Sequence, residues 1–390
     1  MTNPQVAILI FAVAAGQLIK LPFGTHGGIL LLDIIVLASC LFGLINLKFN
    51  LKQPPLVIKA ALIFTLIASL SLILTPLTLN SNEYLTAASY IMRFTSYILF
   101  GWLLIAGAFP ATLQKVDFIV ITSAVILSIL GLLQFILLPD LEIFTTQGWD
   151  PHYYRIVSTF LDPNFFGGFL VLSIIFLLQK LNVPKNWYLL IFALFYLSII
   201  LTFSRSTYLA FAVSLIVLSI LNKSIRTFIL TSVLCLGLVL GFSIYHQNIA
   251  QPKGVDKQKS AESRLGSWQQ GLVLFEQHPI LGVGFNGYRY ALMQYHLGST
   301  EDIESHGGSS NDSSLLHVAS TTGIIGLFSY LFFLSAIFWV GWKNYRDKNP
   351  WGVALLALLS GIISQSFFIN ILFYPPILIF LVLVLSRQKM

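Results

Sequence analysis

The chain has 390 residues, of which 56% are hydrophobic and only 9% are charged, and its mean hydropathy is +0.84. A soluble globular protein has about a quarter of its residues charged, so this composition excludes a soluble globule. The formal net charge of +7 follows from lysines and arginines in the connections between apolar segments, and it gives no indication of a nucleic-acid partner.

Twelve apolar segments run from one end of the chain to the other. Most have about 17–24 residues, the length of helix that crosses a hydrocarbon core of about 30 Å. Their approximate limits are residues 5–22, 27–47, 56–77, 86–109, 117–138, 164–180, 186–203, 206–222, 226–245, 313–342, 351–367 and 369–386. The first has no basic residues before it and is followed at once by the second, so we interpret it as a retained helix and not as a secretion signal. We predict an all-α polytopic membrane protein with about 12 transmembrane helices.

Lysine and arginine are distributed unevenly between the two sides of these segments. Alternate connections and the C-terminal end hold Lys48, Lys52, Lys115, Lys180, Lys185, Lys223, Arg226, Lys343, Arg346, Lys348, Arg387 and Lys389. Cytoplasmic loops are enriched in basic residues, so we expect both termini to be cytoplasmic and the longer loops, 139–163 and 246–312, to face the other side. Arg155, Arg205, Arg264 and Arg289 are then exceptions to the rule. An arginine beside a membrane is costly unless it meets an anion, which points to a phosphate-bearing substrate.

Two of these arginines lie in short polar motifs. Arg155 opens R-I-V-S-T-F-L-D-P-N-F-F-G-G, in which Asp162 and the following Pro and Asn are suited to cap the next helix and the glycines permit close packing. Arg205 lies in the turn T-F-S-R-S-T between two apolar segments. Hydroxyls, backbone N–H groups and a guanidinium at a helix N-terminus suit a pyrophosphate, but a snorkelling arginine that contacts lipid headgroups has the same pattern.

The long loop contains a third motif, centred on Arg264. Apolar residues recur at helical spacing from Ser263 to Phe275, which predicts an amphipathic helix along the membrane surface, with Arg264 near its start. A plain interfacial anchor would show the same periodicity. The segment from His278 to Tyr288 is rich in glycine and is expected to be a turn-containing stretch.

The end of the loop gathers polar residues just before the tenth apolar segment. Asn311 or Asp312 is expected to cap the helix that follows. Alternatively, Asp312, or one of the nearby histidines His306 and His317, is a general base near the membrane boundary. A single histidine within a span, such as His317, is more often a hydrogen-bonded core residue than a catalyst.

The sequence predicts neither a cofactor nor a metal. Cys40 and Cys235 lie within apolar segments, so no disulfide and no site with cysteine ligands is expected. The glycine-rich segment 278–288 lacks the G-K-[ST] of a phosphate loop, so nucleotide binding is not expected either.

Together, five motifs resemble the O-antigen ligase and polymerase superfamily of bacterial envelope glycosyltransferases. They are S-T-F-x-D-P-N-F-F-G, F-S-R-S-T, S-R-x-x-x-W, H-P-I-L-G-V-G-F and N-D-S-S-L-L-H-V-x-x-T-T-G-I-I-G, in this order over residues 155–340. The resemblance implies a fold of the lipid-bilayer glycosyltransferase type (GT-C-like). It also implies a domain organisation of N-terminal transmembrane helices (1–150), an O-antigen ligase/polymerase-like core (151–345) that includes the periplasmic loop 246–312, and C-terminal transmembrane helices (346–390).

The resemblance also implies an activity and roles for particular residues. Members of the superfamily transfer a glycan from undecaprenyl diphosphate at the periplasmic face of the inner membrane, without metal or nucleotide. Arg205 and Arg264 occupy the positions of arginines that hold the lipid-linked diphosphate, and Arg155 is a third candidate for this role. In the ligases a histidine acts as the base; the equivalent position, eleven before Gly323, is Asp312 here. His306 and His317 are the alternatives.

The nature of the acceptor is open at this point. A polymerase transfers the glycan to another lipid-linked repeat unit, whereas a ligase transfers it to lipid A core and a related branch transfers it to protein. The absence of the ligase histidine favours a polymerase, for which membrane lipids and a chain-length regulator are further expected partners. A transporter or flippase would line its cavity with charges from several spans, but only Asp33 and Arg93 lie deep within apolar segments. Aromatic residues of the outer loops are candidates for stacking on sugars or for interfacial anchoring: Trp149, Tyr153, Tyr154, Trp268, Tyr288 and Tyr290.

Overall fold

A computed structural model of the chain describes residues 4–24, 27–48, 50–51, 53–147, 149, 152–179, 186–250, 257–299, 303, 305 and 307–389. The α-helices are α1 (Pro4–Ala15), α2 (Leu31–Asn46), α3 (Leu56–Ile73), α4 (Ser81–Ile105), α5 (Pro110–Gln114), α6 (Val116–Leu137), α7 (Pro163–Leu178), α8 (Asn186–Thr202), α9 (Arg205–Leu221), α10 (Ile225–Tyr245), α11 (Lys257–Gln277), α12 (Tyr288–Gln294), α14 (Ser314–Arg346), α15 (Pro350–Ser366) and α16 (Pro375–Leu385). Strands β1 (Lys20–Phe23) and β2 (Gly27–Leu30) pair in an antiparallel hairpin. Short 3-10 turns span Glu142–Gln147, Ser158–Phe160 and Gly307–Ser309, and a π-helical turn spans His246–Ala250.

Each of the twelve predicted spans overlaps one of these helices. In the described part of the chain, five helical stretches are long and apolar enough to cross a membrane: Leu56–Ile73, Ser81–Ile105, Val116–Leu137, Ile225–Ile249 and Gly307–Arg346. Seven further apolar helices have 10–17 residues. The structure is therefore that of an all-α membrane protein, as the composition indicates, whereas the total of about 12 spans and the GT-C-like type stay predictions.

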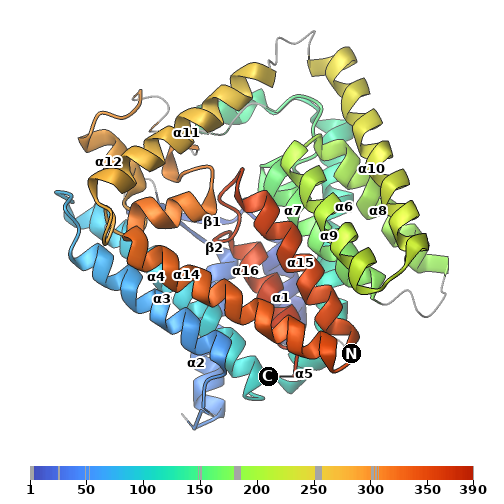
Figure 1. Cartoon of the computed structure of the whole chain (residues 1–390), viewed down its shortest axis with the longest axis horizontal. Coiled ribbons are helices and arrows are strands. Elements are labelled where there is room, and N and C mark those ends of the chain that lie inside the picture. The colour runs from blue at the N-terminus through green and yellow to red at the C-terminus, as the bar shows by residue number, and fades with distance from the viewer. Residues whose placement is uncertain are drawn as a thin grey trace.

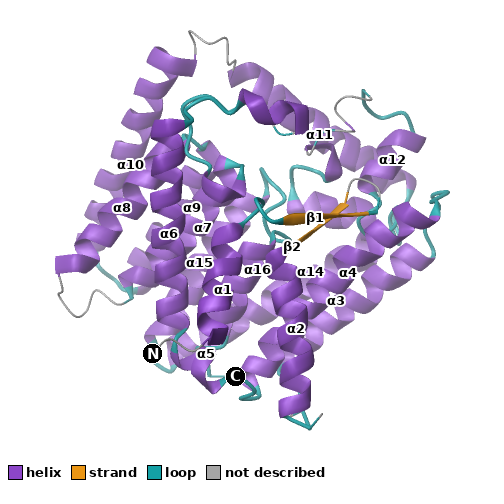
Figure 2. Ribbon diagram, turned by 180° about the vertical axis from the view of Figure 1, so that it is seen from behind, coloured by secondary structure: helices purple, strands orange, loops and turns teal. Residues whose placement is uncertain are grey.

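The helices form a bundle that a surface helix crosses at one end (Figure 1). Within the bundle α15 packs on α9, and α14 packs on both α3 and α15. α11 and α12 lie at the end of the molecule opposite to the end at which α1 begins and α16 ends, as the reverse view also shows (Figure 2). α11 packs against α14, and its Leu274 is fully buried in a small second core with Val283 and Tyr288. The surface helix is thus a folded part of the protein and not only an interfacial anchor.

The first two predicted spans are wrong at their boundary. The helix expected over residues 5–22 ends at Ala15, and residues that were expected to be helical form the hairpin instead. Gly16 has a φ of +53°, and a Cβ there would clash with Thr159; only glycine accommodates both conditions without strain. The second helix begins at Leu31, where the backbone N–H of Leu30 donates to Asp33 Oδ2 at 2.9 Å.

The last predicted span, 369–386, is also too long. α16 begins only at Pro375, so residues 367–374 are an irregular connection between α15 and α16. Two consecutive prolines lack N–H groups and are tolerated in the first turn of a helix, while the residue before a proline favours extended backbone. Tyr374 has φ −73° and ψ 124°, as this rule requires.

The H-P-I-L-G-V-G-F segment pairs with the T-T-G-I-I-G segment at a break in α14. Gly323 has non-helical backbone, with φ 64° and ψ −167°. The segment after His278 pairs with this break: the N–H of Val283 donates to Ser320 O at 3.0 Å, and the N–H of Ile324 donates to Pro279 O at 2.8 Å. This segment consists of turns, as expected. The break thus fixes the end of the long loop against the bundle.

Candidate functional site

Arg205 is the first residue of α9. Ser204 caps this helix: its Oγ accepts a hydrogen bond from the N–H of Thr207 at 3.2 Å and donates to Asn164 Oδ1 at 2.6 Å. Asn164 belongs to the first turn of α7, so the α8–α9 turn and the start of α7 are fixed to each other. The side chain of Arg205 is exposed, and its guanidinium forms no hydrogen bond or ion pair with any described residue.

The predicted cap of α7 is confirmed. Asp162 Oδ1 accepts hydrogen bonds from the N–H groups of Asn164 at 2.6 Å and Phe165 at 3.1 Å, with Pro163 in the first helical position. A Cβ at Gly167 would clash with the side chain of Thr207 in α9, so the expected close packing of the glycines is also present.

Arg205 and Arg264 line one cavity of about 380 Å³, although 58 positions separate them in the sequence. We call it the apolar pocket; its other lining residues are Ser206, Leu209, Leu265, Trp268 and Phe368. Arg264 lies in the third turn of α11, and its guanidinium forms no hydrogen bond or ion pair with the described residues. Two cations that lack a carboxylate partner in the described part of the chain leave positive charge beside an apolar wall.

Arg264 also lines a second, polar cavity of about 760 Å³, which we call the polar cleft. Its walls come from the 139–163 loop, the first turn of α7, α11, α12, the segment before α14 and the connection between α15 and α16. Among the lining residues are Trp149, His152, Asp162, Asn164, Arg264, Ser267, Gln270, Tyr288, Ser309, Ser310, Asp312 and Asn370. Cavities of about 300–1,000 Å³ accommodate ligands the size of several sugar rings or a drug molecule. Arg264 therefore stands where the apolar pocket and the polar cleft meet.

Asp312 lines the polar cleft and is not the cap of α14. The expected cap at Asn311 or Asp312 is wrong: Ser313 is the N-cap, and its Oγ accepts from the N–H of Leu316 at 3.4 Å. The N–H of Asp312 donates to Ser267 Oγ in α11 at 3.0 Å. Asp312 thus lies in the cleft with its backbone N–H bound to α11, while the neighbouring Ser313 caps α14.

Asn311 supplies the support beside it. This side chain is fully buried; its Nδ2 donates to Ser267 O and, at 3.1 Å, to Tyr288 Oη. Its Oδ1 accepts from the N–H of Ser313 at 2.9 Å. Burial raises the pKa of Tyr288 to about 12, so the phenol stays protonated and donates to Ser267 O at 3.2 Å. Asn311 thereby links α11 and α12 to the segment that leads into α14, directly next to Asp312.

The other predicted site residues lie elsewhere. Arg155 lines neither the apolar pocket nor the polar cleft; its Nε donates to Thr202 O, at the end of α8, at 2.8 Å. Burial lowers its pKa, with opposing effects of nearby groups. His317, in α14, is 2% exposed and packs against Tyr288, with ring centroids 5.8 Å apart. It lines a different cavity, described below, and His306 lies outside the described residues.

Several residues of the cleft had no assigned role in the sequence. Phe368 and Asn370 belong to the irregular connection before α16; Asn370 was expected to be part of the last span, and Phe368 lay between two predicted spans. The Pro375–Pro376 pair was the available sign that a helix starts later. His152 is buried in the 139–163 loop, and burial together with Arg155 lowers its pKa to about 3, so its imidazole is neutral at neutral pH.

Within the described ranges, no group of three or more His, Cys, Asp or Glu side chains is arranged to hold a metal ion. Transfer without a metal stays a prediction. The groups that the polar cleft does offer are carboxylates, hydroxyls, amides and a guanidinium.

No curated protein matches the chain. Residues 189–331 match the family model described as O-antigen ligase. This stretch contains Arg205, Arg264 and Asp312, and the match confirms the resemblance to the O-antigen ligase and polymerase superfamily over residues 189–331 of this membrane protein.

Proposed function

We propose that the chain is a glycosyltransferase of the bacterial inner membrane that uses undecaprenyl-diphosphate-linked glycans at the periplasmic face and polymerises repeat units of O-antigen or a related surface polysaccharide. The observation that carries this proposal is the position of Arg264, which lines both the apolar pocket beside Arg205 and the polar cleft beside Asp312. A lipid-linked sugar diphosphate has the same sequence of parts: an apolar chain, an anion and a polar glycan.

The diphosphate is assigned to Arg205 and Arg264. Both guanidiniums are without an ion pair among the described residues, and an arginine binds phosphate oxygens through two parallel N–H groups. The start of α9 adds backbone N–H groups and the positive end of the helix dipole. Arg155, held against the end of α8 by Thr202, adds positive charge close to this turn. The polyprenyl chain would leave along Leu209, Leu265 and Phe368.

The chemical step is a displacement at the anomeric carbon. A hydroxyl oxygen of the acceptor forms the new bond to this carbon, and the bond from the carbon to the phosphate oxygen breaks. Undecaprenyl diphosphate departs with the electron pair, and the arginines stabilise the charge that develops on it. The hydroxyl proton passes to the Asp312 carboxylate, because the hydroxyl becomes acidic only as the bond forms.

The acceptor distinguishes a polymerase from a ligase. The proposal of a polymerase rests on the aspartate that replaces the histidine expected of a ligase at position 312. The second candidate is a ligase that transfers the glycan to lipid A core or to protein, which the description of the matching family favours. The two activities share the donor site and differ only in the second substrate.

The test is transfer by the purified protein in nanodiscs, supplied with undecaprenyl-diphosphate-linked repeat units from its own host. A ladder of longer glycans, formed without lipid A core and lost in Arg264→Ala, is the expected result. A product formed only after lipid A core is added would replace the polymerase by a ligase.

Absence of product with either acceptor, from wild-type protein that is folded and binds the lipid-linked donor, would overturn the proposed transfer. Arg226→Ala is the matched control, because Arg226 is an exposed arginine at the start of α10 that lines neither cavity.

A further inference from the structure

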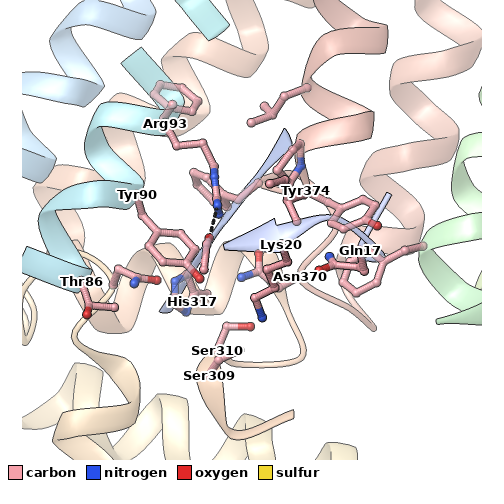
Figure 3. A pocket seen from close by; sticks show the side chains of 18 of the residues that line it. Gln17, Lys20, Thr86, Tyr90, Arg93, Ser309, Ser310, His317, Asn370 and Tyr374 are labelled. Atoms are coloured by element: carbon pink, nitrogen blue, oxygen red, sulfur yellow. Dashed lines mark hydrogen bonds between the residues drawn. The ribbon is translucent and has the colours of Figure 1, made fainter. Parts of the chain in front are cut away.

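A third cavity, of about 200 Å³, lies between the β1–β2 hairpin and α14 and adjoins the polar cleft (Figure 3). We call it the hairpin pocket. It shares lining residues with the cleft, namely Trp149, Phe165, Ser309, Ser310 and Asn370. The two cavities therefore meet two residues before Asp312 in the chain.

The hairpin pocket is lined by three cations. These are Lys20 from β1, Arg93 from α4 and Arg289 from α12, and no aspartate or glutamate is among the described residues that line it. Arg93 is neutralised from behind by Asp33, at 2.7 Å. Arg289 is 6% exposed and donates to Ser305 O at 2.6 Å.

Lys20 is the exception among these cations. Its ammonium forms no hydrogen bond or ion pair with any described residue. Its side chain lies across Gly28 of the paired strand, where even a Cβ would clash with it. Burial, followed by the charges of Arg93 and Arg289, lowers its pKa. A half-buried ammonium with cationic neighbours is unfavourable unless an anion joins it.

The remaining walls suit a sugar ring. Asn370 Oδ1 and His317 Nδ1 are buried and have no hydrogen-bond partner among the described residues. Sugar hydroxyls can donate to such atoms, and a buried polar atom without a partner is costly. Tyr90, Phe165 and Phe373 add aromatic surface. In Figure 3, Lys20 and Asn370 lie between Arg93 on one side and Ser309 and Ser310 on the other.

The volume limits what the pocket can hold. Its volume of about 200 Å³ is smaller than that of a typical pocket for a drug-sized ligand, which is about 300–1,000 Å³. One substituted monosaccharide therefore fits better than a lipid-linked oligosaccharide. Neither Arg205 nor Arg264 lines the hairpin pocket. With the donor diphosphate at these two arginines, a sugar that reaches Asp312 from the hairpin pocket belongs to the acceptor.

We propose that the hairpin pocket binds a monosaccharide residue of the acceptor glycan that carries an anionic group, a carboxylate or a phosphate ester, with the anion on Lys20 and the ring hydroxyls on Asn370 and His317. Only the assignment of this monosaccharide to the acceptor rests on the proposed function. The binding of an acidic sugar stands on the pocket itself.

The experiment measures binding of small probes to the full-length protein in nanodiscs by ligand-observed NMR. The probes are glucuronate and glucose 1-phosphate as acidic sugars, glucose as the neutral sugar and inorganic phosphate as the anion without a sugar. At least one acidic sugar is expected to bind about tenfold more tightly than glucose and than phosphate, a difference of about 1.4 kcal/mol.

Variants assign the site. Lys20→Gln should remove the advantage of the acidic sugar, whereas Lys20→Arg should keep most of it because the charge is retained. Lys115→Gln, at an exposed lysine before α6, is the matched control and should bind like the wild type. Arg264→Ala should weaken only the binding of phosphate groups at the diphosphate site and should keep the advantage of glucuronate over glucose, which separates the two sites.

Equal binding of glucose and both acidic sugars, or an unchanged advantage in a folded Lys20→Gln protein, would overturn the inference. Phosphate that binds the Arg264→Ala protein as tightly as both acidic sugars would overturn it as well. These outcomes do not depend on transfer. A protein that binds the acidic sugar but forms no glycan product would overturn the proposed function and leave the hairpin pocket standing.

Discussion

Arg93 and Arg264 are both arginines of a membrane protein, but their surroundings differ. Arg93 lies inside the bundle, where its guanidinium binds Asp33 Oδ2 at 2.7 Å and Gly28 O at 2.7 Å and lies 4.5 Å above the ring of Tyr90. Arg264 lies between two cavities without such partners in the described part of the chain. The position of an arginine near a membrane therefore does not by itself indicate that it binds a ligand. An arginine whose charge is balanced within the fold stabilises the fold, and one that faces a cavity unbalanced is available to a ligand.

The largest effect on stability is expected at the balanced charge. Arg93→Ala leaves Asp33 buried without its cation, which costs about 3–5 kcal/mol. We expect a much lower unfolding midpoint in a denaturant titration of the purified protein, whereas Arg226→Ala should unfold like the wild type. Replacing both partners with apolar residues should recover part of the loss. Wild-type stability of Arg93→Ala would remove the distinction between the two arginines.

The complementary effect is expected at the unbalanced charges. Arg264→Ala and Arg205→Ala should each lower the transfer rate by about 10²–10³-fold, because each removes a cation from the leaving diphosphate. Their unfolding midpoints should stay at the wild-type value. Arg264→Lys should retain part of the rate, since it keeps the charge but loses the paired N–H geometry. Normal transfer by both alanine variants would contradict the assignment of the diphosphate.

Asp312 and Ser313, adjacent residues at the start of α14, show the same contrast between a residue that serves transfer and one that serves stability. Asp312→Asn should lower the transfer rate by about 10²-fold, because it removes the proposed base. Ser313→Ala removes the helix cap and should cost about 1 kcal/mol of stability with little loss of transfer. Both quantities come from the same protein preparations. A transfer rate in Asp312→Asn close to that of wild type would transfer the role of base to another group.

His152 shows a third way in which a basic side chain is accommodated, as a buried neutral group. Its folded-state pKa is about 3, below the value of 6.5 for an exposed histidine. The unfolded chain therefore binds an extra proton between these pH values, so stability is lost as the pH falls from about 6.5 towards 3 and is unaffected above that window.

Replacement by His152→Asn should flatten this acid dependence, measured as the unfolding midpoint of both proteins at several pH values between 7 and 4. Asp162, whose pKa burial raises, is present in both proteins, so its contribution cancels in the comparison. Parallel pH curves would show that His152 is not buried as the structure places it.

The sequence predicted those parts of the site that depend on neighbouring residues. Asp162 and Pro163 start a helix by local hydrogen bonding and backbone geometry, and the structure confirms both. The Ser204–Arg205 turn and the helix that carries Arg264 were expected for similar reasons. The length and composition of the apolar runs placed each of the twelve predicted spans on a helix.

Local reasoning failed where distant segments compete for the same groups. Position 312 or 311 was expected to cap α14, but Ser267 in α11 and Tyr288 in α12 bind these two residues, and Ser313 becomes the cap. The hairpin replaced the end of a predicted span because Gly16 meets Thr159, a contact between residues 143 positions apart in the chain.

The sequence by itself determined that the protein is a helical membrane protein and which polar motifs it carries. It also determined which arginines are exceptions to the enrichment of basic residues in cytoplasmic loops. It could do so because hydropathy, capping and charge distribution are properties of short segments. Only the tertiary structure decided which of these groups share a cavity. Arg205 and Arg264 meet in one pocket, Arg264 and Asp312 meet in another, and Lys20 is confined beside Arg93 and Arg289. The physical reason is that the charge balance and the burial of a side chain depend on residues brought together from separate helices. A local sequence pattern does not encode which of these residues become neighbours.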